Sequence, residues 1–235
     1  MMIQNRDIFL QNLADNLGRP VRTKVQRPQW KHLPQHEVHK DATKDELLDV
    51  LKIQCANIHT KCFTTTVADL PATLTQVVEE FGGESVVAWK DERFAQFGLT
   101  ATFADWKQKQ MEVYEWDATN HAENIRQAEK ANIGIAISEI TLAESASAVL
   151  YSGADRGRTM NFLPEKSIVL IPKSTLVPRF TQAARHLHEQ VARGEQVPSC
   201  ILVMTGPSNS ADIEMVLIVG VHGPVKATYI VIDDL

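Results

Sequence analysis

Short apolar segments alternate with helical patterns along most of the chain beyond about residue 40. Thr43 and Glu46 have the spacing of a capping box, and Leu47, Leu48 and Leu51 follow on one face, which predicts a helix starting here. Further helices are predicted over 71–81, 121–131, 181–193 and 211–219. Strands are predicted over 62–66, 85–89, 111–116, 133–137, 147–151, 167–171, 200–204 and 227–232.

Most of these strands are apolar throughout rather than alternating, which is typical of strands buried on both faces. Since helices separate many of them, the pattern predicts an α/β fold with a mostly parallel sheet covered by helices on both sides. Ligand sites on such sheets lie at the carboxyl ends of the strands. We therefore expect functional side chains in segments that directly follow a strand.

The first 40 residues differ from the rest of the chain. Phe9, Leu10, Leu13 and Leu17 form one stripe of a short helix over 6–17. Segment 19–40 has three prolines, no apolar period and a basic bias, which indicates either an extended arm lying over the body or a partner, or a solvated linker. We expect an N-terminal region of residues 1–40 and a single α/β domain over 41–235.

Composition and charge narrow the classes of function. The chain has 235 residues, 44% hydrophobic and 23% charged, which is typical of a globular protein. Its start does not resemble a signal peptide, and no apolar run approaches the ~20 residues of a membrane helix, so we expect a cytoplasmic protein with no membrane span. The net charge is -5, and residues 41–235 are more acidic than the whole, which argues against nucleic acid as a partner.

Cysteine and histidine usage argues against a metal or cofactor site in this chain. The three cysteines, Cys55, Cys62 and Cys200, are far apart and form no CxxC motif, whereas an iron–sulfur cluster takes about four thiolates. His32 and His36 of the basic segment are separated by Pro34, which breaks the helix that would place them on one face. We expect no metal site here, and no flavin or nicotinamide fingerprint is present.

The segment MTGPSNSADIEMVLIVGVHGP, residues 204–224, contains the first candidate site. A buried strand is expected to lead into a loop, and a helix is expected to begin near Ala211, so that hydroxyls and free backbone N–H groups meet at a helix N-terminus. This arrangement predicts a phosphate-like or other small anionic ligand. The predicted ligand-binding residues are Thr205, Gly206, Pro207, Ser208, Asn209 and Ser210.

Simpler interpretations of the same segment stay open. Ser210 is also the natural N-cap of the predicted helix, and Asp212 and Glu214 would lie in its first turn, where the helix dipole favours acidic residues. His222 sits in a tight turn after Gly220 and can titrate near neutral pH, so we name it as a catalytic candidate, although loop histidines are more often structural or exposed.

The segment 140–164 contains the second candidate site. Glu144 precedes a predicted strand among small and apolar residues, so partial burial is expected to suit it to acid–base or nucleophilic catalysis. The alternative is a glutamate that organises a turn. Arg156 and Arg158 lie in the glycine-containing turn 153–158 and are predicted to clamp a phosphate or carboxylate, unless they are ordinary exposed arginines.

Several segments together resemble one known family. They are TLAES at 141–145, GRTMNFLPEKSIVLIPKSTLVPR at 157–179, VPSCILVMTGPSNSADIE at 197–214 and VGVHGPVKATYIV at 219–231. With PQWKHLPQHEV and VYEWDA, they make the chain similar to the lactate-utilisation protein C family, whose members carry a LUD domain. One difference concerns the residues after Glu144, where the family usually has Ser-Gly-Thr and this chain has Ser145-Ala146-Ser147.

The resemblance implies a fold and a role. The implied fold is a three-layer α/β/α sandwich similar to ribose-5-phosphate isomerase, the glucosamine-6-phosphate deaminases and the CoA transferases. The implied role is in oxidation of L-lactate to pyruvate and growth on lactate, together with two companion iron–sulfur proteins as partners. Since this chain lacks cluster ligands, we expect it to be an accessory or substrate-handling subunit, with the clusters in the partners.

Two other classes of function stay open from the sequence. The first is a stand-alone acyl-transfer enzyme that works as CoA transferases do, with Glu144 forming an acyl anhydride, or an enzyme with a phosphate-bearing ligand. The second is an interaction module whose basic segment 19–40 docks on an acidic partner.

Overall fold

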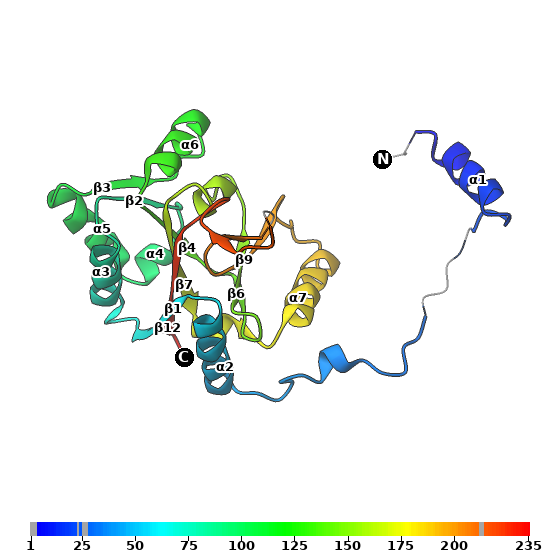
Figure 1. Cartoon of the computed structure of the whole chain (residues 1–235), viewed down its shortest axis with the longest axis horizontal. Coiled ribbons are helices and arrows are strands. Elements are labelled where there is room, and N and C mark those ends of the chain that lie inside the picture. Colours follow the sequence, from blue (N-terminus) through cyan, green and yellow to red (C-terminus); the bar gives the residue numbers. More distant parts are fainter. Residues whose placement is uncertain (1–3, 23, 25–27, 212–213) are drawn as a thin grey trace. The chain divides into compact units, whose positions relative to one another are not determined.

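The computed structural model describes residues 4–22, 24, 28–211 and 214–235 (Figure 1). The chain divides into two units, Met1–Pro34 and Gln35–Leu235. The first unit contains helix α1 (Arg6–Asn16), which confirms the predicted N-terminal helix. The described part of 17–33 has no helix or strand, and a 3-10 turn, η1 (Pro34–His36), stands at the division.

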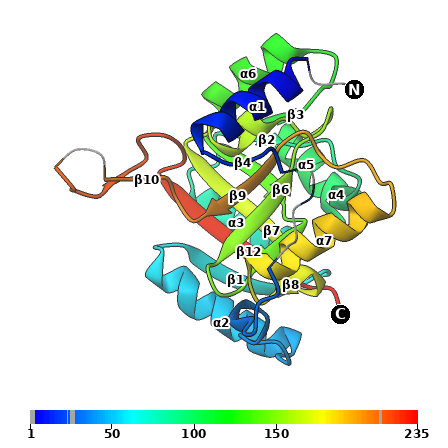
Figure 2. The same cartoon turned by 90° about the vertical axis from the view of Figure 1, so that its right-hand side faces the viewer.

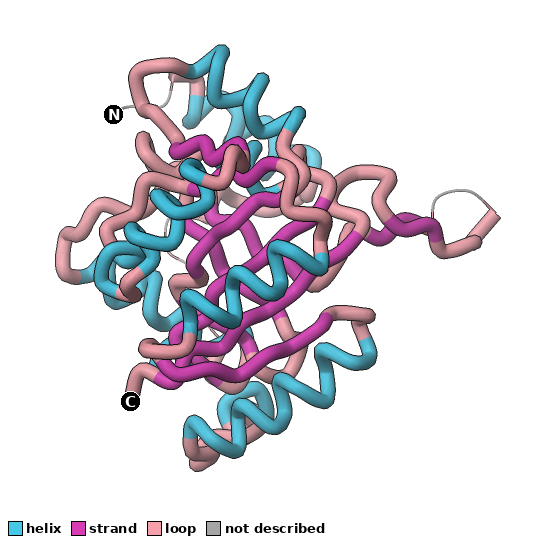
Figure 3. Tube along the Cα trace, turned by 90° about the vertical axis from the view of Figure 1, so that its left-hand side faces the viewer, coloured by secondary structure: helices cyan, strands magenta, loops and turns pink. Residues whose placement is uncertain are grey.

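The second unit is built on a six-stranded, fully parallel sheet, called the main sheet (Figure 3). The strand order is β1-β12-β7-β4-β2-β3. The strands are β1 (Lys61–Thr66), β2 (Ser85–Ala88), β3 (Glu112–Glu115), β4 (Ile133–Ile137), β7 (Lys166–Pro172) and β12 (Lys226–Asp233). The central strands β4 and β7 are almost entirely buried, which explains their unbroken apolar sequences and confirms the predicted mostly parallel sheet.

A second, four-stranded sheet has the order β8-β5-β6-β9 and is called the second sheet. Its strands are β5 (Ile140–Leu142), β6 (Ser147–Tyr151), β8 (Leu176–Val177) and β9 (Ile201–Thr205). One of its faces joins the core of the main sheet through side chains such as Ala148 and Leu150. The other face packs Ile140, Leu142 and Val149 against Ala183 of α7 (Phe180–Ala192).

The second sheet was not predicted, because segments 147–151 and 200–204 were expected to continue the parallel sheet. Instead, β6 pairs antiparallel with both β5 and β9. In Figure 1, β6 and β9 lie between the main sheet and α7. Since β6 is buried on both faces in this position, its sequence is apolar throughout and cannot be distinguished by pattern from a central parallel strand. Strand β9 is only half buried, which corrects the expected buried strand before Gly206.

Helices complete the fold and mostly match the predicted ranges. They are α2 (Lys44–Asn57), α3 (Leu70–Glu80), α4 (Arg93–Gln96), α5 (Leu99–Gln108) and α6 (His121–Lys130), with 3-10 turns η2 (Arg158–Asn161) and η3 (Lys173–Thr175). The predicted capping box opens α2: Glu46 N–H donates to Thr43 Oγ1 (3.3 Å), and Thr43 N–H donates to Glu46 Oε2 (2.7 Å). The short α4 and the helix α5 were not predicted. Across the described residues, no helix is both long enough and apolar enough to cross a membrane.

The helix predicted over 211–219 is wrong. The segment contains a hairpin, in which β10 (Asn209–Ser210) pairs antiparallel with β11 (Ile218–Val219). At its base, Gly220 N–H donates to Ser208 O (2.9 Å), and the β-branched Ile218 and Val219 suit a strand better than a helix. Glu214 has a φ of 54°, which is not helical, and Asp212 lies outside the described residues. Figure 2 shows this hairpin projecting from the body of the second unit.

Candidate functional site

The carboxyl ends of β2 and β4 form the topological switch point of the main sheet. From β2 the chain passes to β3 on one side, and it then returns to β4 on the other side and continues outward to β7 and β12. Open parallel sheets bind ligands in the crevice at such a point. Here the crevice is a cleft of about 600 Å³, lined by residues that follow β2, by Glu139 after β4 and by the turn Gly153–Arg156 after β6.

Backbone hydrogen bonds hold the turn over the cleft. Gly153 N–H donates to Arg156 O (3.0 Å), and Arg156 N–H donates back to Gly153 O (3.2 Å). Lys90 N–H, directly after β2, donates to Asp155 O (3.1 Å) and so ties the turn to the main sheet. The second sheet therefore supplies one wall of a cleft whose other walls come from the main sheet.

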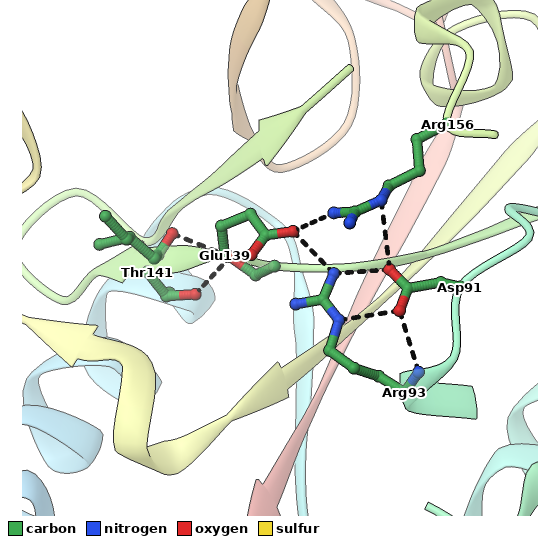
Figure 4. Close-up of polar contacts among 7 residues, drawn as sticks. Asp91, Arg93, Glu139, Thr141 and Arg156 are labelled. Carbon is green, nitrogen blue, oxygen red and sulfur yellow. Dashed lines mark hydrogen bonds and ion pairs between the residues drawn. The ribbon is translucent and has the colours of Figure 1, made fainter. Parts of the chain in front are cut away.

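Four charged side chains form a linked cluster in this cleft (Figure 4). Arg93 donates from Nε to Asp91 Oδ1 (3.0 Å) and from Nη2 to Asp91 Oδ2 (2.6 Å). The same Nη2 donates to Glu139 Oε1 (2.7 Å), and Arg156 Nη1 donates to that oxygen as well. Arg156 Nε lies 3.6 Å from Asp91 Oδ2. Each arginine thus joins two carboxylates, one that follows β2 and one that follows β4.

The contacts within the cluster favour the charged forms of Asp91 and Arg93. Burial by itself would raise the pKa of Asp91, whose side chain is 4% exposed, but hydrogen bonds from Arg93 and the charges of Arg93 and Arg156 outweigh burial and hold that pKa below its usual range. Burial would likewise lower the pKa of Arg93, and the hydrogen bonds and charges of Asp91 and Glu139 reverse this and raise it. Asp91 and Arg93 are therefore both ionised at neutral pH.

Two tryptophans set the position of Arg156. Trp89 Nε1 donates to the carbonyl of Gly157 (3.1 Å), and the ring of Trp116 packs directly against Gly157. Both tryptophans are buried, at the carboxyl ends of β2 and β3. Because the backbone next to Arg156 is fixed by two core side chains, the guanidinium group has a well-defined starting point.

Glu144 is exposed, with 40% of its side chain accessible, so the burial expected from its apolar neighbours is absent. Its carboxylate is bound by Arg179, with Nε 2.8 Å from Oε2 and Nη2 donating to Oε1 at 3.1 Å. Two residues further on, Ala146 has a φ of 49°, so the backbone keeps the left-handed conformation that a glycine would favour at this position. The catalytic assignment of Glu144 stays a prediction.

The segment Thr205–Ser210 lies at the amino ends of the main sheet's strands, not at the carboxyl ends as expected. Gly206 packs against Thr60, which directly precedes β1. Ser208 N–H donates to Pro224 O (2.9 Å), and Val225 N–H donates to Glu165 O (2.8 Å), just before β12 and β7. The strands β9 and β6 run antiparallel to each other, so β9 ends at the start of β6 and at the opposite edge from the cleft.

The donors expected to bind an anion at this loop are used within the protein. Gly206 N–H donates to the Tyr229 hydroxyl (3.0 Å), Ser208 N–H bonds to Pro224, and Pro207 has no N–H. Asn209 Nδ2 donates to Pro207 O (3.0 Å), and Ser210 is the second residue of strand β10 of the hairpin. Since the described part of 211–219 also contains no helix, the structure gives no support for the predicted helix N-terminal anion site.

The remaining predicted site residues do not come together in one place. The hydroxyl of Thr205 is in a chain with Ser147 Oγ (2.6 Å) and, through it, Ser145 Oγ (2.7 Å). His222 is exposed, and its backbone N–H donates to Ser208 Oγ (3.3 Å). Arg156 is in the cleft, whereas Arg158 is exposed at the start of η2 and does not line the cleft, so the two arginines do not form a clamp.

Tyr229 links the two sheets, and its hydroxyl gives a testable prediction. The buried hydroxyl accepts from Gly206 N–H and lies within hydrogen-bond distance of Ala146 O (3.0 Å) and Met204 O (3.3 Å). Burial raises its pKa, so the hydroxyl keeps its proton for donation. We expect Tyr229→Phe to lower the free energy of unfolding by about 1–3 kcal/mol, because it leaves the Gly206 N–H without a partner. Urea unfolding measures this change.

Tyr151 provides the matched control for that measurement. Its hydroxyl is buried and has no hydrogen-bond partner in the described part of the chain. Tyr151→Phe therefore removes the same atom without breaking a bond, and we expect it to be neutral or slightly stabilising. Equal losses of stability in the two variants would contradict the linking role of Tyr229.

Sequence reasoning found Arg156 but missed Asp91, Arg93 and Glu139. The available signal was that each of these residues comes a few positions after a buried strand, β2 or β4, at the edge where ligand sites form. Short charged runs after strands are also typical of solvated turns, so the signal was weak. Within the described ranges, no three His, Cys, Asp or Glu side chains come together as a metal site.

Comparisons with known proteins show relatives over almost the whole chain. The LUD domain matches residues 48–232. Lactate utilization protein C from Geobacillus sp. (strain WCH70) is 53% identical over 234 residues, covering 99% of this chain and 97% of that protein. Lactate utilization protein C from Anoxybacillus flavithermus is 55% identical over 228 residues, covering 97% and 99%.

A solved structure with a similar fold is a DUF162 family protein from Deinococcus radiodurans, crystallised at 1.70 Å resolution. It has a TM-score of 0.56 and 15% sequence identity, and the match covers 82% of this chain and 99% of that one. At this level of identity the likeness concerns the fold. It agrees with the α/β architecture predicted from the sequence.

Proposed function

Because this chain belongs to the LUD domain family, we propose that it functions in lactate utilisation. The observation that carries the proposal is the identity of about half of all residues, over nearly the full length of both chains, with proteins named lactate utilization protein C. The switch-point cleft supports it, since a polar cleft at the carboxyl ends of parallel strands suits the handling of a small substrate.

More specifically, the chain acts as a non-redox subunit of an L-lactate-oxidising system that converts L-lactate to pyruvate. In this proposal two iron–sulfur proteins are its partners, they carry the clusters and the electrons, and the system is cytoplasmic. The three cysteines of the chain fall short of the ligand set of a cluster and support this division of labour: Cys55 is buried in the core, and Cys62 and Cys200 are half buried on β1 and before β9.

Growth of a deletion strain tests the role in lactate utilisation. A strain lacking this gene, with the genes of both partners intact, is expected to grow normally on glucose and poorly on L-lactate, and the wild-type gene is expected to restore growth. Normal growth of the deletion strain on L-lactate would show that the assigned role is wrong.

Reconstitution tests whether the chain is a subunit that works together with two iron–sulfur proteins. The chain is purified alone and with the two iron–sulfur proteins under anaerobic conditions, and lactate-dependent reduction of a dye is followed. We expect activity with all three proteins and none with this chain alone. Full activity of the two partners without this chain would contradict a subunit role and point to a separate reaction.

A further inference from the structure

Both arginines of the cleft have hydrogen-bond donors that no described residue uses. Arg93 engages the acidic partners through Nε and Nη2, and Arg156 does so through Nη1 and Nε. Arg93 Nη1 and Arg156 Nη2 have no partner among the described residues, and both side chains line the cleft. A terminal guanidinium nitrogen carries two N–H groups, and their strongest partners are carboxylate and phosphate oxygens.

An unused acceptor belongs to the same cluster. Glu139 Oε1 takes both arginine contacts, while Oε2 has no hydrogen-bond partner in the described part of the chain. A bare carboxylate bound to the arginines would be repelled by this oxygen. A ligand that also carries a hydroxyl group would donate to it and replace repulsion with a hydrogen bond.

The charges along the cleft disfavour ligands with more than one negative charge. Lys90 adds one cation to the two arginines, and Glu92 and Asp155 add two acids to Asp91 and Glu139. The lining therefore carries one net negative charge, which opposes dianions and polyanions such as phosphate esters. A monoanion is opposed less strongly, and the unused N–H groups of the two arginines can donate to it directly.

We propose that the switch-point cleft binds a small monoanionic hydroxycarboxylate, with its carboxylate on the unused nitrogens of Arg93 and Arg156 and its hydroxyl on Glu139 Oε2. The cleft is larger than a three-carbon acid, so selectivity comes from these polar groups and not from shape. The site follows from the geometry of the cleft, whereas the choice of L-lactate as the first probe rests on the proposed function.

Calorimetric titration of the purified full-length protein tests the ligand class with matched probes. L-lactate is compared with propanoate, which has the same carbon count and carboxylate but no hydroxyl, and with inorganic phosphate. We expect saturable binding of L-lactate in the millimolar range or tighter, and at least about tenfold weaker binding of propanoate and phosphate. No saturable binding of L-lactate, or tighter binding of either comparison ligand, would overturn the proposal.

Variants of Arg156 and Glu139 test the contacts assigned to these residues. Arg156→Lys keeps the charge but removes the forked donors, and we expect at least about a tenfold loss of L-lactate affinity. Glu139→Gln is expected to reduce the preference for L-lactate over propanoate. Arg126→Lys is the control, because Arg126 pairs with Glu123 on α6 and does not line the cleft. Melting curves confirm that each variant is folded, and unchanged binding in both cleft variants would contradict the assignment.

The two proposals fail separately. If the deletion strain grows normally on L-lactate while the cleft binds hydroxycarboxylates, the binding site is supported and the role in lactate utilisation is contradicted. If growth on L-lactate requires the protein but titration detects no ligand, the role in lactate utilisation is supported and the assignment of the cleft is contradicted.

Discussion

Gly157→Ala is expected to destabilise the protein by about 3 kcal/mol or more and to disorder the cleft. A Cβ at this position would lie 1.8 Å from Cζ2 and 2.1 Å from Cη2 of Trp116, far inside van der Waals contact. Trp116 is 6% exposed and belongs to the main core, so a shift of its ring would disturb the packing of its neighbours. Either the ring or the backbone beside Arg156 has to shift, and the shift displaces the guanidinium from Asp91 and Glu139.

The expected loss of stability comes from the contact with Trp116 alone, because Gly157 has a φ of -68° that any residue adopts. Gly153, four residues earlier in the same turn, is the control: its added Cβ meets no atom within 4 Å. We expect Gly153→Ala to change the free energy of unfolding by less than about 0.5 kcal/mol in urea denaturation. If Gly157→Ala were as stable as Gly153→Ala, the close packing of Trp116 on the turn would be disproved.

Asp91→Asn is expected to lower the free energy of unfolding by about 3–5 kcal/mol at pH 7, as for other buried ion pairs that lose one partner. The side chain of Asp91 is 4% exposed, and it takes two hydrogen bonds from the Arg93 guanidinium. Without the carboxylate, Arg93 and Arg156 share Glu139 as their one remaining acidic partner in the cluster. Denaturation in urea at pH 7 measures the difference.

The lowered pKa of Asp91 also predicts how the stability of the protein depends on pH. Since the pKa of Asp91 is lowered in the folded protein, its contribution is fully present above the pKa of the unfolded chain, near 4, and is lost as the pH falls through the folded-state value. The wild type should therefore lose stability more steeply than Asp91→Asn as the pH falls below about 4.

Asp105→Asn is the control for both measurements, because Asp105 pairs with Lys109 on the exposed surface of α5 with 51% of its side chain accessible. Exposed pairs of this kind contribute little, so we expect a change below about 1 kcal/mol. An equal effect of the two substitutions at pH 7 would argue against a structural role of the buried cluster.

Local patterns were enough to predict much of the fold. Strands β4 and β6 appear at the predicted residues, and the capping box of Thr43 is formed, because these signals depend on neighbours in sequence. Which sheet a strand joins depends on residues far apart. Ser147 pairs with Thr205, and nothing in the apolar sequence of β6 distinguishes that antiparallel pairing from a place in the main sheet.

The cleft was harder to predict than the fold. Asp91, Glu139 and Arg156 come from three segments that meet because two different sheets approach each other. Arg156 was named for its glycine-containing turn, but its acidic partners were not. The loop after β9 was expected to hold the site because its composition suits an anion. Contacts with Tyr229 and Pro224, which no local pattern shows, use those N–H groups instead.

The position of β12 has a consequence for the order of events during synthesis. In the main sheet β1 pairs with β12 alone, and β12 separates it from β7. Strand β1 is made early, at residues 61–66, but its neighbour is complete only when residue 233 has left the ribosome. Until then one edge of β7 and both edges of β1 are unpaired, so the nascent chain presents open strand edges that a chaperone would need to protect.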